Sequence, residues 1–212
     1  MTSKNLSKYL SYILRHGSID IGLEISTDGY CLMNDLLIFL NKSNDKSNDK
    51  SNDNKITVDI IKEIVKNDEK TRFTIKNENN ILFIRANQGH SINTVKSTDL
   101  LKKIKPLSLK ECVHGTNVNA WFFIKSEGLK KMNRNEIHFA KSADTSKGLR
   151  KNCEILIYLD LEKCSNDNIQ FYESDNGVIL IPEPLDPKYF KKVLYNGLPL
   201  NMDDKLDHLK IL

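Results

Sequence analysis

The chain has 212 residues, of which 39% are hydrophobic and 28% are charged, and its formal net charge is +4. This balance is typical of a globular protein with one domain or two small ones. No run of residues is apolar enough to cross a bilayer, which argues against a membrane partner. The mild positive charge is compatible with a polyanionic partner without requiring one.

The four cysteines are scattered along the chain and form no C-x-x-C pair. This spacing disfavours both a zinc site and a disulfide framework. It predicts reduced thiols, as expected of a soluble protein of the cytoplasm or nucleus.

The first predicted element is a helix whose end carries two cationic side chains. Apolar residues at positions 6–14 recur at helical spacing, with Ser3 placed to cap the start and Gly17 placed at the C′ position. The last turn holds Arg15 and His16. Cations there complement the helix dipole, and together they also suit an anion, so the sequence leaves both interpretations open.

The rest of the first half predicts two more helices and a hairpin. Asn34 or Asp35 is placed to cap one helix, and Thr57 is placed to cap the next. Residues 43–53 repeat Ser-Asn-Asp-Lys, contain nothing that could enter a core, and are predicted to be a disordered surface insertion. The predicted elements are a strand at 30–32, helices at 36–40 and 58–65, and hairpin strands at 72–75 and 81–84. This order suits a winged-helix-like module that meets nucleic acid, and equally a plain α+β scaffold.

The second half is predicted to be rich in strands. Residues 96–106 form a basic stretch of little periodicity, read as a connector between two lobes. A helix around residues 121–124 is expected to end at Gly128, and Asn176-Gly177 is a turn signal. The predicted strands are 137–140, 154–160, 171–172 and 178–181. The fold class expected from the whole chain is α+β.

Residues 84–91 place several polar groups directly after an apolar strand. Arg85 is a planar cation suited to phosphate oxygens, and Gly89 allows a tight turn. His90 and Ser91 add hydrogen-bonding groups at the strand end, where sites are often built on a rigid scaffold. A salt-bridged Arg followed by an ordinary polar turn is the alternative interpretation.

The pattern of motifs points to phosphate chemistry. Neither the Rossmann glycine motif nor the P-loop motif occurs in the sequence. Arg and His side chains instead recur at the ends of predicted elements, where converging guanidinium groups would hold phosphate and offset charge that builds up on it. This interpretation does not specify the reaction.

Nine sequence blocks, in order, resemble the RNA 2′-phosphotransferase family (the tRNA 2′-phosphotransferases). The blocks are residues 7–17, 27–30, 72–73, 84–91, 114–116, 128–129, 137–140, 148–150 and 174–180. Each block alone is a weak signal, but their shared order is specific. The resemblance covers the chain from about residue 3 to about residue 190.

The resemblance implies two lobes and a defined reaction. Residues 1–100 would form a winged-helix-like RNA-binding lobe that includes the 43–53 insert, and residues 107–212 an ADP-ribosyltransferase-like lobe that binds NAD. The 2′-phosphate of a spliced tRNA would attack C1″ of NAD and expel nicotinamide, after which the ribose 2″-hydroxyl would attack the phosphate. The products would be 2′-hydroxyl RNA and ADP-ribose 1″,2″-cyclic phosphate. No metal is implied, and we expect a monomer.

The resemblance also implies roles for individual residues of this chain. The catalytic residues would be Arg15, His16, Arg85 and Arg150. NAD would be bound by His114, Gly115, Thr116, Arg134, Ser174 and Asn176. The RNA would be contacted by Gln88, His90 and Ser91, which would shape the loop more than act in the chemistry.

One position departs from the family pattern. Glu136 stands where the family usually has a histidine, close before His138. A carboxylate is unfavourable beside a pyrophosphate unless it bonds a ribose hydroxyl or points to solvent. An NAD contact from this position is therefore in doubt.

Two other functions are compatible with the sequence. One is an ADP-ribosyltransferase that acts on a different nucleic-acid phosphate, because the same NAD chemistry needs only a different incoming phosphate. The other is an RNA-binding module without catalytic activity, which the complete Arg and His set argues against.

Overall fold

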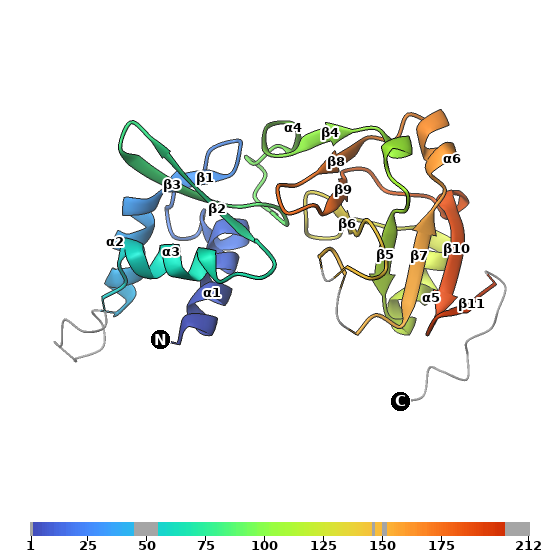
Figure 1. The fold of residues 1–212 in the computed structure, drawn as a ribbon, viewed down its shortest axis with the longest axis horizontal. Coiled ribbons are helices and arrows are strands. Elements are labelled where there is room, and N and C mark those ends of the chain that lie inside the picture. Colours follow the sequence, from blue (N-terminus) through green and yellow to red (C-terminus); the bar gives the residue numbers. More distant parts are fainter. Residues whose placement is uncertain (1, 45–54, 146, 150–151, 202–212) are drawn as a thin grey trace. The chain divides into compact units, whose positions relative to one another are not determined.

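The computed structural model describes residues 2–44, 55–145, 147–149 and 152–201 of the chain. It divides into two compact units, Met1–Leu100 and Leu101–Leu212, each with its own hydrophobic core (Figure 1). The predicted site residue Arg150 and positions 45–53 of the predicted insertion lie outside the described residues. Within the described ranges, no helix combines the length and apolarity needed to cross a membrane.

The first unit places its three longer helices, α1, α2 and α3, on one side of a small antiparallel sheet of strand order β1-β3-β2 (Figure 1). Its elements are α1 (Ser3–Tyr12), a π-helical turn (Ile13–Gly17), β1 (Tyr30–Leu32), α2 (Met33–Asn44), α3 (Val58–Lys66), β2 (Phe73–Glu78), β3 (Ile81–Ala86) and α4 (Ser97–Leu100). Apolar residues of the three longer helices and of the sheet face one another and form the core of this unit.

Local signals in the sequence account for several of these boundaries. The Thr57 hydroxyl accepts a hydrogen bond from the Ile60 amide at the start of α3, as predicted. Asn79 and Asn80 adopt φ angles of +50° and +65°, which close β2 and β3 into a two-residue hairpin turn. The predicted hairpin is therefore confirmed, with a tighter turn than residues 77–80.

Three predicted helix ends were wrong. The cap of α1 is Thr2, one residue before Ser3, and α2 already begins at Met33, before Asn34 and Asp35. Gly17 does not take the left-handed C′ conformation, because the helix continues through it as a π-helical turn. The Tyr12 ring lies where a Cβ on Gly17 would stand, which gives this glycine a packing reason instead.

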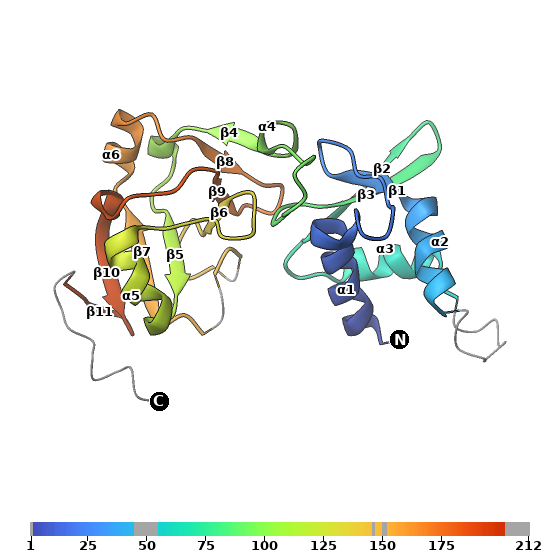
Figure 2. The same cartoon turned by 180° about the vertical axis from the view of Figure 1, so that it is seen from behind.

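The second unit contains two antiparallel sheets, of strand orders β11-β10-β7-β5 and β4-β8-β9-β6. Its elements are β4 (Lys102–Ile104), β5 (Val113–Thr116), α5 (Val118–Glu127), β6 (Ile137–Phe139), β7 (Ile155–Leu159), α6 (Leu161–Asn166), β8 (Phe171–Glu173), β9 (Ile179–Ile181), β10 (Phe190–Tyr195) and β11 (Leu198–Pro199). Helix α5 lies on one face of the first sheet (Figure 2), where Trp121 contacts Phe190.

The stretch at residues 96–106, predicted to be a basic connector of little periodicity, holds two short regular elements. It contains α4 and β4, and β4 pairs with β8 through partners such as Ile104 and Phe171. The pairing joins residues far apart in the sequence, so local periodicity over three strand residues could not reveal it.

The mixed architecture with antiparallel sheets confirms the predicted α+β class. All four cysteines are free thiols, as the spacing predicted. The comparison of the two units with winged-helix and ADP-ribosyltransferase lobes stays a prediction.

Candidate active site

The first group of predicted site residues comes from the π-helical turn that follows α1. Ile13 and Leu14 of this turn are buried in the core and anchor it. Arg15 is half-buried and His16 is exposed. A π-helical turn inside or after an α-helix is rare and is frequently found at functional sites. The turn therefore presents two cationic groups from a firmly held backbone.

The loop after β3 is tied directly to this turn. The Ser91 amide donates a hydrogen bond to the Arg15 carbonyl, with 2.9 Å between N and O. The Ser91 hydroxyl bonds His16 Nδ1, also at 2.9 Å. Gly89, with a φ of +87°, allows the reversal that brings the loop there, and Gln88 is half-buried in the same loop. Groups 75 positions apart in the sequence thus form one site.

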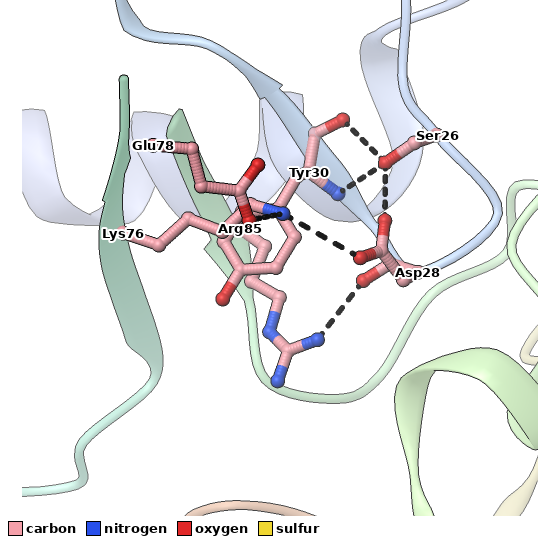
Figure 3. Close-up of polar contacts among 6 residues, drawn as sticks. All are labelled: Ser26, Asp28, Tyr30, Lys76, Glu78 and Arg85. Atoms are coloured by element: carbon pink, nitrogen blue, oxygen red, sulfur yellow. Dashed lines mark hydrogen bonds and ion pairs between the residues drawn. The ribbon is translucent and has the colours of Figure 1, made fainter. Parts of the chain in front are cut away.

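Arg85 is held by its own strand neighbours (Figure 3). In the β1–β3 pairing Arg85 is directly opposite Tyr30, and its guanidinium carbon lies 4.6 Å from the centre of the Tyr30 ring. Arg85 Nη1 donates to the Asp28 carbonyl oxygen at 3.1 Å. The side chain is only 9% exposed. Contacts on two sides fix the direction of the guanidinium.

Lys76 shares the Tyr30 ring with Arg85 (Figure 3). Its Nζ lies 4.1 Å from the ring centre and forms ion pairs with Glu78 at 3.0 Å and Asp28 at 3.9 Å. One tyrosine ring thus contacts two cationic side chains. Sequence reasoning did not identify Tyr30 or Asp28 as supports for Arg85. The cross-strand register that reveals them requires knowledge of the pairing.

The surroundings of His90 at this site lower the pKa of its imidazole. Its side chain is 0% exposed, and burial is the largest cause of a pKa lowered from 6.5 to about 3. The remaining causes are the positive charges of Arg15, His16 and Arg85, which therefore all lie near the His90 ring. A neutral imidazole close to two guanidinium groups marks a region of positive potential, which favours a bound anion.

The second group of predicted residues lies on β5 in the second unit. His114, Gly115 and Thr116 are half-buried, and β5 pairs with β7. His114 Nδ1 donates to the His138 carbonyl at 2.9 Å, and the His114 ring meets Phe139 edge-on. In the neutral ring this bond assigns the proton to Nδ1 and leaves Nε2 as the acceptor. A Cβ on Gly115 would collide with the Cys153 sulfur, so the backbone packs closely here.

Ser174 and Asn176 lie inside the turn between β8 and β9. Both are buried, and the Ser174 hydroxyl bonds Asn176 Oδ1 at 2.7 Å and the Val178 amide at 3.2 Å. These bonds give the pair a role in shaping the turn. Arg134 is exposed in the loop before β6. Glu136 is 2% exposed, so its carboxylate does not point to solvent.

In chemical terms, the first unit offers two guanidinium groups, an imidazole and a hydroxyl around a region of positive potential. Such donors match the oxygens of a phosphate group. The second unit offers the His114 imidazole and the Thr116 hydroxyl on one half-buried strand. Both sets are present on the residues that the sequence predicted, with Arg150 outside the described ranges.

Known proteins that this chain resembles are named as RNA or tRNA 2'-phosphotransferases. Residues 1–183 match the family described as RNA 2'-phosphotransferase, Tpt1 / KptA family. The chain is 36% identical over 194 residues to the putative tRNA 2'-phosphotransferase of Schizosaccharomyces pombe, covering 88% of this chain and 50% of that protein. It is 35% identical over 201 residues to tRNA 2'-phosphotransferase 1 of Danio rerio, covering 88% and 83%.

A bacterial relative shows the same similarity. The chain is 36% identical over 179 residues to the probable RNA 2'-phosphotransferase of Rhizobium leguminosarum, covering 82% of this chain and 86% of that protein. The chain thus spans about half the length of the Schizosaccharomyces pombe relative and most of the other two. These matches over most of its length show that the chain belongs to the RNA 2′-phosphotransferase (Tpt1 / KptA) family.

Proposed function

We propose that this chain removes an internal 2′-phosphate from RNA, of the kind left at a tRNA splice junction, and transfers it to NAD. Family membership supports the transfer of an RNA 2′-phosphate. The observation that carries the proposal is the loop after β3, where Ser91 bonds the Arg15 carbonyl and His16 Nδ1 and so joins Arg15, His16 and Arg85 in one cluster. Their combined charge suits a phosphate dianion better than a neutral ligand.

The proposed reaction has two steps with both nucleophiles supplied by the substrates. An oxygen of the RNA 2′-phosphate forms a bond to C1″ of the NAD ribose, and the bond to nicotinamide breaks. The ribose 2″-hydroxyl then attacks the phosphorus, and the RNA 2′-oxygen leaves and takes up a proton. The products are 2′-hydroxyl RNA, nicotinamide and ADP-ribose 1″,2″-cyclic phosphate.

The first unit would hold the phosphate in both steps. In the second step the phosphorus becomes pentacoordinate and carries more negative charge than in the ground state. Arg15, His16 and Arg85 would stabilise this charge more than that of the bound substrate, which lowers the barrier. Because Arg85 is fixed by Tyr30 and Asp28, its guanidinium does not need to reorganise during the reaction. Arg150 is assigned to the same work by the family resemblance alone.

The second unit would bind NAD as the co-substrate. Its residues fit this ligand chemically: His114 Nε2 can accept from a ribose hydroxyl, and the Thr116 hydroxyl lies on the same half-buried strand. The exposed Arg134 guanidinium suits a pyrophosphate. Ser174 and Asn176 would support the site through the turn that they stabilise.

The proposal is tested by measuring nicotinamide release from NAD with one RNA in three forms. The forms carry an internal 2′-phosphate, only a terminal 5′-phosphate, or no such phosphate. We expect rapid release only with the internal 2′-phosphate. Equal nicotinamide release with the terminal 5′-phosphate would favour an ADP-ribosyltransferase that acts on a different nucleic-acid phosphate. No release with any RNA, although the 2′-phosphorylated form binds, would favour a binding module.

A further inference from the structure

Tyr12 is a large aromatic side chain that the proposed function does not use. It is the last residue of α1, and its side chain is 54% exposed. Its ring centre lies 6.1 Å from that of His16, with 49° between the ring planes. Tyr12 therefore lies immediately beside His16, one of the proposed phosphate-binding residues of the first unit.

Gly17 determines where the Tyr12 ring lies. A Cβ at position 17 would stand 2.8 Å from Tyr12 Cε1 and 3.3 Å from Cδ1, closer than carbon atoms pack. Any larger residue at position 17 would thus require the ring to shift away from its place against the π-helical turn. His16 is itself fixed through Nδ1 by Ser91. The two rings are held next to each other by separate contacts, although Tyr12 is largely exposed to solvent.

We infer that Tyr12 is a stacking platform for the nucleobase of the nucleotide whose 2′-phosphate the enzyme removes. This inference rests on the proposed function. In a nucleotide the base is attached to C1′ and the 2′-phosphate to the adjacent C2′ of the same ribose. A phosphate bound at His16 therefore brings its own base within one sugar ring of His16, where the Tyr12 ring lies.

Physical chemistry favours this occupant. Proteins that bind single-stranded nucleic acid combine cationic groups for the backbone with aromatic rings for the bases. Every base has a flat face, so stacking on tyrosine orients the nucleotide without selecting one base. A platform at this position would favour the phosphate of a nucleotide over inorganic phosphate, because the base and the phosphate are bound as a pair.

The test measures binding without NAD, so that no turnover occurs. Fluorescence anisotropy gives the Kd of a short labelled RNA with one internal 2′-phosphate, and of the same RNA with an abasic sugar at that nucleotide or at either neighbour. For Tyr12→Leu we expect roughly 5- to 150-fold weaker binding to the intact RNA, the range measured for loss of one stacked base. Tyr12→Phe should bind as the wild type does, because only the ring is needed.

Tyr12→Leu and the abasic RNA together form a double-mutant cycle, one change on the protein and one on the RNA. Removing the base of the phosphorylated nucleotide should weaken binding to the wild type but not to Tyr12→Leu. Gly17→Ala, which displaces the ring without removing it, should behave like Tyr12→Leu. The inference would be overturned if removing that base weakened binding equally in the wild type and in Tyr12→Leu. It would also be overturned if only the removal of a neighbouring base weakened binding to the wild type.

The result that would contradict the proposed function differs from the result that would contradict the stacking platform. If the wild type binds 2′-phosphorylated RNA but transfers no phosphate in the presence of NAD, the function is wrong while the binding cycle still reports on Tyr12. If transfer occurs and the Tyr12→Leu variant binds the intact RNA as the wild type does, only the platform is wrong. Thermal unfolding of each variant shows whether that variant is folded under the conditions of the binding measurement.

Discussion

Arg85 illustrates how a neighbouring residue can position a reactive group. Its guanidinium contacts the Tyr30 ring on one side and donates to the Asp28 carbonyl on another. A cation held over an aromatic face gains about 0.5–2 kcal/mol, more when the pair is desolvated. Arg85 is almost fully buried, so the Tyr30 ring contacts a guanidinium that is largely shielded from water.

Replacing Tyr30 by Leu should lower kcat/KM for 2′-phosphorylated RNA roughly 2- to 30-fold, the range that corresponds to loss of one cation–π contact. Tyr30→Phe should restore the activity, since the ring and not the hydroxyl supports the guanidinium. Steady-state kinetics of both variants measure this effect. In an Arg85→Ala background Tyr30→Leu should cause no further loss, and an additive loss there would show that Tyr30 acts independently of Arg85.

His90 should make the stability of the protein depend on pH. Its pKa is about 3 in the folded protein and near 6.5 when unfolded, so only the unfolded chain takes up this proton between those values. The contribution of His90 is therefore fully present above about pH 6.5 and is lost as pH falls, by about 1.4 kcal/mol per pH unit.

Denaturant unfolding of the wild type and of His90→Gln at pH 4.5, 5.5, 6.5 and 7.5 tests this dependence. The difference between the two proteins removes the contribution of the other titrating groups. We expect the wild type to lose its advantage over His90→Gln as the pH falls below about 6.5. A difference that stays constant over this range would show that His90 takes up its proton in the folded protein as easily as in the unfolded chain.

At the scale of elements, the sequence predicts structure where the signal is local. Thr57 caps α3 and Gly128 ends α5 as expected, because a cap depends on a few adjacent residues. The hairpin of β2 and β3 follows from two apolar stretches around an asparagine-rich turn. The strand at residues 30–32 is also confirmed by β1.

Elements that depend on distant partners were missed. The short strand β4 is stabilised by pairing with β8, and β10 by pairing with β7. The turn at Asn196 and Gly197, with φ angles of +47° and +85°, was an available signal for the β10–β11 hairpin. The π-helical turn left no mark in the periodicity of α1, since its effect appears only after residue 12.

Gly128 and Gly197 allow a matched test of backbone conformation. Both have positive φ, +77° and +85°, but a Cβ on Gly128 would collide with the Leu185 carbonyl, whereas nothing lies within 4 Å at Gly197. Gly197→Ala should cost about 1–2 kcal/mol from backbone strain alone. Gly128→Ala should cost clearly more, because the collision adds to the strain and disturbs the pairing of Leu129 with Leu185. Chemical denaturation of the two variants compares the costs, and equal values would contradict the predicted collision.

At the scale of the whole molecule, the family could be predicted from the sequence, whereas the geometry of the candidate site could not. Ordered sequence blocks identified the family and named Arg15, His16 and Arg85. The connection of Ser91 to the π-helical turn and the charges around His90 required the folded chain, since they join segments that are 75 positions apart. The proposed division of labour places phosphate binding in the first unit and NAD binding in the second.

The central claim is that the phosphate itself passes from the RNA to a product derived from NAD. The most direct measurement follows an RNA whose single internal 2′-phosphate is labelled with ³²P, incubated with the protein and NAD, with Arg85→Ala as the matched control. We predict that the label moves to ADP-ribose 1″,2″-cyclic phosphate and the RNA gains a 2′-hydroxyl, with the rate lowered by orders of magnitude in Arg85→Ala. Label that stays on the RNA, or appears as inorganic phosphate without NAD, would contradict the account.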